Sequence, residues 1–157
     1  MENFDPEKAA RVWQRVQGKA APAPEENPPP VSPGLSACIA GEQTDAAAYL
    51  NLSRRFQGKQ ALLLQKMAQQ EQAHAACLRG MGVLTGYRRN PAGAASSHPE
   101  GTEALLRRCY GRELQCIAAY EARTGDPQFG PVYARLAAQE REHCCRILEL
   151  LGSLREK

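Results

Sequence analysis

Two Glu-x-x-His sequences are the strongest indication of chemistry in this chain. Glu71 precedes His74 and Glu140 precedes His143, although the chain has only three histidines. On a helix, residues three apart lie on one face, roughly 5 Å from each other. A carboxylate and an imidazole at that separation can bind one metal ion, and this mixture of oxygen and nitrogen donors suits iron(II) or manganese(II). We therefore predict a metal site with ligands from both pairs.

The two pairs belong to an internal repeat. Residues 38–49 and 67–74 recur as residues 109–120 and 136–143, at offsets of 71 and 69. The repeat predicts a duplicated helical hairpin, each copy carrying a lone glutamate, a tyrosine and a Glu-x-x-His pair. The residues that recur are Cys38, Glu42, Tyr49, Glu71 and His74 in the first copy, and Cys109, Glu113, Tyr120, Glu140 and His143 in the second.

Four helices are needed to carry these residues. Gly58 separates the first two, and the turn-forming residues 124–128 separate the last two. Residues 81–101 are rich in Gly, Pro and Ser, which predicts a long connection between the hairpins. Two hairpins joined by a long crossover form an all-α four-helix bundle. The expected helices span about residues 35–56, 60–80, 102–123 and 129–154.

The N-terminal part of the chain has a different composition. Residues 1–18 are expected to form a short helix that starts at Asp5, and residues 19–34 a proline-rich linker. The bundle domain then occupies residues 35–157. The apolar face of the short helix includes Trp13 and either covers the bundle or a neighbouring subunit, or docks the protein to a larger assembly.

Each expected bundle helix places a carboxylate within its apolar stripe. Four buried carboxylates would repel one another unless they are protonated, paired with cations or bound to metal. No Lys or Arg recurs in these stripes, which favours metal. The heights also agree, because the midpoint between Glu42 and Glu71 lies beside Gly58, and that between Glu113 and Glu140 lies at Asp126. We expect the four glutamates to meet at one level of the bundle.

The series Glu, Glu-x-x-His, Glu, Glu-x-x-His, with a Tyr seven residues after each lone Glu, resembles rubrerythrin and its ferritin-like relatives. The resemblance covers about residues 36–152 and implies a ferritin-like bundle with two iron ions, manganese being an alternative. It implies hydrogen bonds from Tyr49 and Tyr120 near the centre. At the position where rubrerythrin has a further glutamate ligand, this chain has Cys116. The implied ligands are Glu42, Glu71, His74, Glu113, Glu140 and His143.

In that family the centre reduces hydrogen peroxide to water. We accordingly expect an oxidoreductase that acts on peroxide or dioxygen. The chain has no Cys-x-x-Cys from which a rubredoxin-type iron site could be built, so an external protein is expected to donate the electrons. Three alternatives stay open: iron oxidation for storage or delivery, a catalase-like manganese centre, and a metal-stabilised module without turnover.

Composition limits the partners and the compartment. A net charge of +3 with scattered arginines gives no reason to expect nucleic acid or an anionic membrane as a partner. There is no apolar run of membrane-spanning length and no apolar core of a secretory signal, so we expect a cytoplasmic protein with reduced cysteines. We also expect a homo-oligomer, such as a dimer. Cys38, Cys109 and Cys116 are expected to fill core space, since peroxide chemistry at a thiol would require a lowered pKa.

Overall fold

The computed structural model describes residues 34–86 and 100–155. The expected N-terminal helix, nearly all of the proline-rich linker and most of the connection between the hairpins, including His98, lie outside the described residues. The domain boundaries predicted from the sequence therefore stay predictions. Within the described residues all regular structure is helical.

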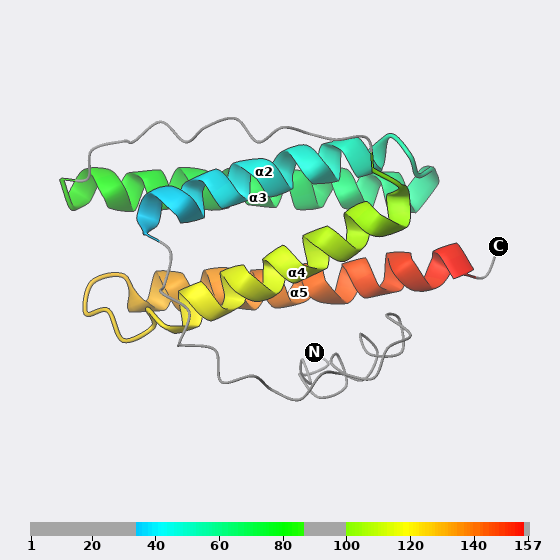
Figure 1. Ribbon diagram of the computed structural model, residues 1–157. Coiled ribbons are helices and arrows are strands. Elements are labelled where there is room, and N and C mark those ends of the chain that lie inside the picture. The colour runs from blue at the N-terminus through cyan, green and yellow to red at the C-terminus, as the bar shows by residue number, and fades with distance from the viewer. Residues whose placement is uncertain (1–33, 87–99, 156–157) are drawn as a thin grey trace, which may run out of the picture. The chain divides into compact units, whose positions relative to one another are not determined.

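Four helices form two hairpins, as the sequence predicts (Figure 1). In each hairpin the two helices pack closely along their length, and α2 also packs against α4. No described helix is long and apolar enough to cross a membrane. The helices are α2 (Leu35–Ser53), α3 (Gly58–Leu84), α4 (Thr102–Glu121) and α5 (Gly130–Arg155).

The connection between the hairpins joins opposite ends of the four-helix unit. In Figure 1, α3 ends on the left and α4 begins on the right, so these two helices run in the same direction. This arrangement requires a long crossover, because a short loop would make α3 and α4 antiparallel neighbours. The predicted four-helix bundle of two hairpins with a crossover is thus confirmed.

The end of α3 differs from the prediction. The Gly-, Pro- and Ser-rich composition of residues 81–101 predicts a connection starting at residue 81, yet the helix continues to Leu84. Met81 is only 5% exposed, so burial of its side chain favours another helical turn. The helix ends where the Thr85 hydroxyl donates a hydrogen bond to the Met81 carbonyl and Gly86 adopts a positive φ of 71°.

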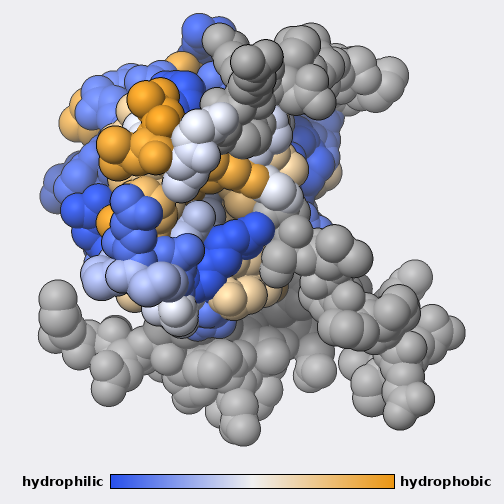
Figure 2. All heavy atoms as spheres, turned by 90° about the vertical axis from the view of Figure 1, so that its left-hand side faces the viewer, coloured by the Kyte–Doolittle hydropathy of each residue, from blue (hydrophilic) through white to orange (hydrophobic). Residues whose placement is uncertain are grey.

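The hydrophobic core extends to the end of the four-helix unit at which α2 and α5 begin. A hydrophobic cluster there includes Leu78, Met81, Tyr120 and Tyr133. Figure 2 views this end and shows hydrophobic residues interspersed among hydrophilic ones. Nearer the middle of the helices, the hydrophobic core gives way to the buried polar residues described below.

Each hairpin turn depends on a specific local structure. Gly58 adopts a φ of 56°, a left-handed conformation in which glycine has no steric penalty, and α3 starts there. In the second hairpin the Asp126 carboxylate accepts hydrogen bonds from the backbone N–H groups of Gln128 and Phe129. Pro131 follows in the first turn of α5, where its missing N–H has no cost.

Gly130 is held in close contact with the end of that turn. A Cβ atom at this position would lie 2.3 Å from the carbonyl oxygen of Thr124. We expect Gly130→Ala to lower the free energy of unfolding by about 1–3 kcal/mol, because backbone must move. Gly152→Ala is the matched control in the same helix, since nothing lies within 4 Å of its added Cβ, and it should stabilise by about 0.5–1 kcal/mol. Urea unfolding of both variants tests the opposite signs.

Candidate metal centre

The six predicted donor side chains all lie inside the four-helix unit, near the middle of their helices. None is more than 3% exposed, and each helix contributes at least one of them. They form two adjacent groups whose ligand atoms lie within 4.8 Å of one another. The predicted common level is therefore observed. The six are Glu42 on α2, Glu71 and His74 on α3, Glu113 on α4, and Glu140 and His143 on α5.

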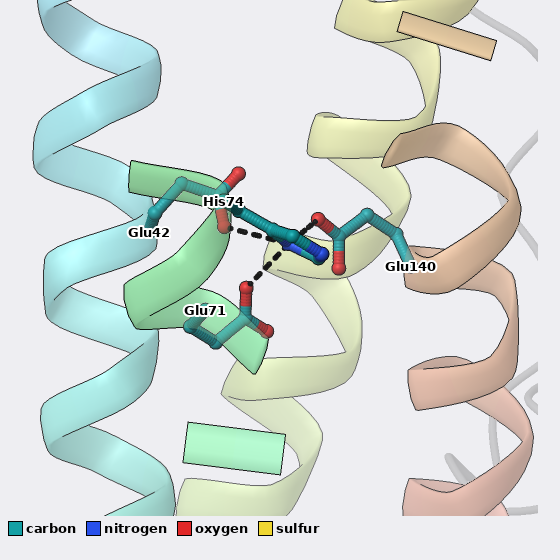
Figure 3. Close-up of side chains that lie close together, drawn as sticks. All are labelled: Glu42, Glu71, His74 and Glu140. Carbon is teal, nitrogen blue, oxygen red and sulfur yellow. Dashed lines mark hydrogen bonds and ion pairs between the residues drawn. The ribbon is translucent and has the colours of Figure 1, made fainter. Parts of the chain in front are cut away.

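The first group surrounds the Nδ1 atom of His74 (Figure 3). This atom lies 2.9 Å from Glu140 Oε1, 3.2 Å from Glu71 Oε2 and 3.4 Å from Glu42 Oε2. The three carboxylates come from three different helices and converge on this one nitrogen atom. Such a set of three carboxylates and one imidazole can hold one divalent cation.

The second group repeats this arrangement around His143. Its Nδ1 atom lies 2.8 Å from Glu71 Oε1, 3.0 Å from Glu140 Oε2 and 3.6 Å from Glu113 Oε1. The two imidazole rings are stacked, with centroids 6.0 Å apart and an angle of 27° between their planes. The two groups are thus neighbours related by the sequence repeat.

Glu71 and Glu140 belong to both groups. Each directs one carboxylate oxygen toward His74 and the other toward His143. Glu42 and Glu113 each belong to a single group. From the sequence, the lone glutamates could either complete the shell of one ion or bridge two ions. The geometry places each lone glutamate in a single group and the glutamates of the two Glu-x-x-His pairs in both.

The two tyrosines connect the hairpins at the centre. The Tyr49 hydroxyl on α2 donates a hydrogen bond to Glu113 on α4, and the Tyr120 hydroxyl on α4 donates one to Glu42 on α2. Both tyrosines are fully buried. Each therefore contacts the lone glutamate of the opposite hairpin, which fixes that carboxylate from its outer side.

Two glutamines complete the surroundings of the imidazoles and were not identified from the sequence. His74 Nε2 lies 3.0 Å from Gln139 Oε1, and His143 Nε2 lies 3.2 Å from Gln70 Oε1. A carbonyl oxygen as partner places one ring proton on Nε2, so Nδ1 is the ring atom that faces the carboxylates and that a metal ion can use once its own proton is lost. The repeat did contain this information, because both glutamines immediately precede the Glu of a Glu-x-x-His pair.

A partly buried ion pair lies beside the centre and was also missed. Asp45 is 1% exposed, and both of its carboxylate oxygens accept hydrogen bonds from Arg112, at 2.5 and 3.0 Å. Arg112 additionally donates to the Gly41 carbonyl at 2.9 Å. Burial raises the pKa of Asp45 to about 6, although the guanidinium opposes this. Asp45 is thereby committed to Arg112 and does not belong to either ligand group.

Burial and mutual proximity divide the four glutamates into two classes. Burial raises the pKa of Glu42 to about 9 and places that of Glu113 well above its usual value. Burial also acts on Glu71 and Glu140, but the two adjacent histidines outweigh it and lower the pKa of both. The shared glutamates are accordingly carboxylates, and the lone glutamates hold protons at neutral pH when no metal is bound.

The two buried histidines have raised pKa values, whereas burial in an apolar core alone lowers the pKa of an imidazole. Burial lowers the pKa of each, but the surrounding carboxylates outweigh it and raise both pKa values to about 12. Two imidazolium ions and two carboxylates then balance one another. Without metal, the six side chains carry four dissociable protons and no net charge.

The hydrogen bonding of this cluster is incomplete in a way that fits metal. Among the described residues, the buried side-chain nitrogen and oxygen atoms without a hydrogen-bond partner are all in the cluster: one oxygen of Glu71, both of Glu140, and His143 Nδ1. These atoms approach one another but are not aligned as donor and acceptor. Unsatisfied buried polar atoms are rare in folded proteins. Their convergence is the arrangement that a cation between them would satisfy.

The cysteines near the centre lack the features of reactive thiols. Cys38 and Cys109 are buried and Cys116 is partly buried, as expected for residues that fill core space. Burial raises the pKa of all three, and neighbouring carboxylates add to this effect for Cys109 and Cys116. A raised pKa disfavours the thiolate that peroxide chemistry at sulfur requires.

Comparison with known proteins adds no family to this description. No protein-family model matches the chain, and no curated protein shows significant sequence similarity to it. The structure itself therefore carries the conclusion that the chain is a four-helix bundle with a buried Glu/His cluster able to hold metal ions.

Proposed function

We propose that this protein is a di-iron oxidoreductase that reduces peroxide, or dioxygen, with electrons from an external donor protein. The observation that carries the proposal is the pair of carboxylate–imidazole groups that share Glu71 and Glu140. Two metal ions held at adjacent sites by common carboxylates can act together on one small molecule. The resemblance to rubrerythrin in the spacing of these residues supports iron and a peroxide substrate.

The protein residues would hold and orient the two ions. His74 and Glu42 would serve one ion and His143 and Glu113 the other, with Glu71 and Glu140 available to either. Bound iron would supply redox equivalents and act as a Lewis acid. Gln70 and Gln139 would keep each imidazole in the tautomer that has a lone pair on Nδ1.

The tyrosines would hold the two lone glutamates in place. Tyr49 and Tyr120 donate hydrogen bonds to Glu113 and Glu42, and burial raises the pKa of both phenols, so each hydroxyl keeps its proton and orients its carboxylate. All six donors are at most 3% exposed, and burial excludes bulk water from their surroundings. Water exclusion strengthens electrostatic interactions in the site and suppresses side reactions.

Metal binding should release about four protons for every two divalent ions at pH 7. The reason is that Glu42, Glu113 and both histidines hold protons in the metal-free protein and must lose them to act as ligands. Affinity should consequently fall steeply as the pH is lowered. Calorimetric titration with manganese(II) in buffers of different ionisation enthalpy measures the number, and a release of one proton or none would contradict this electrostatic description.

The proposed function is tested by loading the protein anaerobically with iron(II) and mixing it rapidly with hydrogen peroxide. We expect about two irons per chain and oxidation of the di-ferrous centre on a millisecond-to-second scale, followed by absorption typical of an oxo-bridged ferric pair. Glu142→Gln is the control. Glu142 is an exposed glutamate on α5, the helix of Glu140 and His143, and its replacement should leave the reaction unchanged. A loaded centre that does not react with peroxide or dioxygen would exclude the enzyme. Oxidation of many irons per chain would instead support iron storage.

A further inference from the structure

A pocket of about 230 Å³ lies between α3 and α5, on the outer side of the His74 imidazole. Gln70, His74 and Cys77 line it from α3, and Arg135 and Gln139 from α5. The metal groups lie on the Nδ1 side of His74, whereas Gln139 contacts its Nε2 atom. The pocket is therefore separate from the metal sites and adjoins the residues that orient the imidazoles.

The polar groups of this pocket are mostly hydrogen-bond donors. The carbonyl oxygens of Gln70 and Gln139 are occupied by the two imidazoles. Their side-chain NH₂ groups have no hydrogen-bond partner within residues 34–86 and 100–155 and remain for a ligand. Arg135 has no carboxylate partner in the same part of the chain, and its guanidinium lies 4.0 Å from the Cys77 sulfur. Positive charge and amide donors together favour an anion.

The repeat places different residues at two of these positions on the His143 side. The positions that correspond to Ala73 and Cys77 are Glu142 and Arg146, at an offset of 69. Glu142 would bring a negative charge, and Arg146 is paired with Glu149 at 3.2 Å. The pocket beside His74 has two small, uncharged residues at these positions instead.

We propose that this pocket binds a small anion, held by the Arg135 guanidinium and the carboxamides of Gln70 and Gln139. An anion in this pocket contacts Gln139 and Gln70, which are hydrogen-bonded to His74 and His143. The site goes beyond the proposed redox function, because its donors do not depend on the metal.

Cys77 offers a direct test, because it lies in the pocket and can report which reagents enter. Its thiolate displaces iodide from iodoacetate, an anion, and from iodoacetamide, its neutral analogue. The ratio of the two rates cancels any change in thiolate content and measures the preference for the anion. The rates at Cys77 are followed by peptide mass spectrometry in the full-length protein as purified, with Cys145, an exposed cysteine on α5, as the internal reference.

We expect the ratio of the iodoacetate rate to the iodoacetamide rate to be higher at Cys77 than at Cys145. In Arg135→Gln this ratio should fall about fivefold at Cys77, which is roughly the effect of one charge pair at 4 Å in water. Arg79→Gln is the matched control, since it removes the same charge from an exposed position two residues from Cys77. Inorganic phosphate at constant ionic strength should slow the iodoacetate reaction at Cys77 in the wild type and not in Arg135→Gln.

Equal ratios at the two cysteines, equal effects of the two arginine variants, or no protection by phosphate would each overturn the proposal. The alkylation rates require no metal and no turnover. A protein that fails to load iron would therefore refute the proposed function while leaving this test intact.

Discussion

Replacing Glu140 with glutamine should remove both metal ions at once. Its two oxygens lie 2.9 Å and 3.0 Å from the Nδ1 atoms of His74 and His143, so one substitution weakens both groups. An amide is nearly the same size as a carboxylate but lacks its charge and one of its acceptor oxygens. We expect the affinity for each ion to fall about 100-fold or more, beyond the range seen when an outer partner of a ligand is lost. Metal analysis after desalting and calorimetric titration measure the loss.

The lone glutamates provide the matched comparison. Glu42 belongs to the His74 group alone and Glu113 to the His143 group alone. Glu42→Gln and Glu113→Gln should therefore each retain close to one ion per chain, whereas Glu71→Gln should behave like Glu140→Gln. Circular dichroism verifies that each variant is folded. If Glu140→Gln retains one ion, or if Glu42→Gln loses both, the shared role of Glu71 and Glu140 is wrong.

Metal should also raise the thermal stability of the protein strongly. Ligand at 100 times its dissociation constant stabilises a folded protein by about 2.7 kcal/mol per site, hence about 5 kcal/mol for two independent sites. For a domain of this size, that corresponds to an increase of roughly 10–20 °C in melting temperature. The physical origin is the cluster itself, whose buried oxygens and His143 Nδ1 lack partners without metal. Differential scanning calorimetry with and without manganese(II) measures the increase.

Two controls make this measurement decisive. A chelator should return the melting temperature to its starting value, and Glu140→Gln should show little increase with metal. The metal-free variant should be less stable than the metal-free wild type, because Glu140→Gln leaves two imidazolium ions facing one carboxylate instead of two, so the increase with metal is compared within each protein. An increase of the same size in wild type and variant would mean that the metal binds elsewhere on the protein.

The sequence predicted the level at which the donors meet, because hairpin geometry is simple. The turn of an antiparallel hairpin must lie midway between residues at one height, and Gly58 and Asp126 satisfy this for the two glutamate pairs. Helical periodicity then placed each glutamate in an apolar stripe. Local rules of this kind sufficed for the fold class and for bringing the six donors together.

Contacts between hairpins could not be predicted, because they depend on how helices cross. Tyr49 was expected to hydrogen-bond near the centre, but nothing in the residue spacing distinguished Glu113 from Glu42, which lies on the same helix as Tyr49. Asp45 was overlooked because Arg112, the cation that makes its burial tolerable, is 67 positions away. The continuation of α3 past Gly80 was likewise decided by tertiary burial of Met81, which outweighs the low helix propensity of glycine.

The partly buried Asp45–Arg112 pair distinguishes two hairpins that are otherwise alike. Each hairpin offers two glutamates, one histidine and one tyrosine, so two first hairpins from different molecules could assemble an equivalent set of donors. The repeat, however, places Gly41 where Arg112 would be needed and Cys116 where Asp45 would be. An assembly of two first hairpins would bury two aspartates without a guanidinium, at a cost of several kcal/mol. This asymmetric contact therefore favours pairing of a first hairpin with a second hairpin over pairing of two first hairpins.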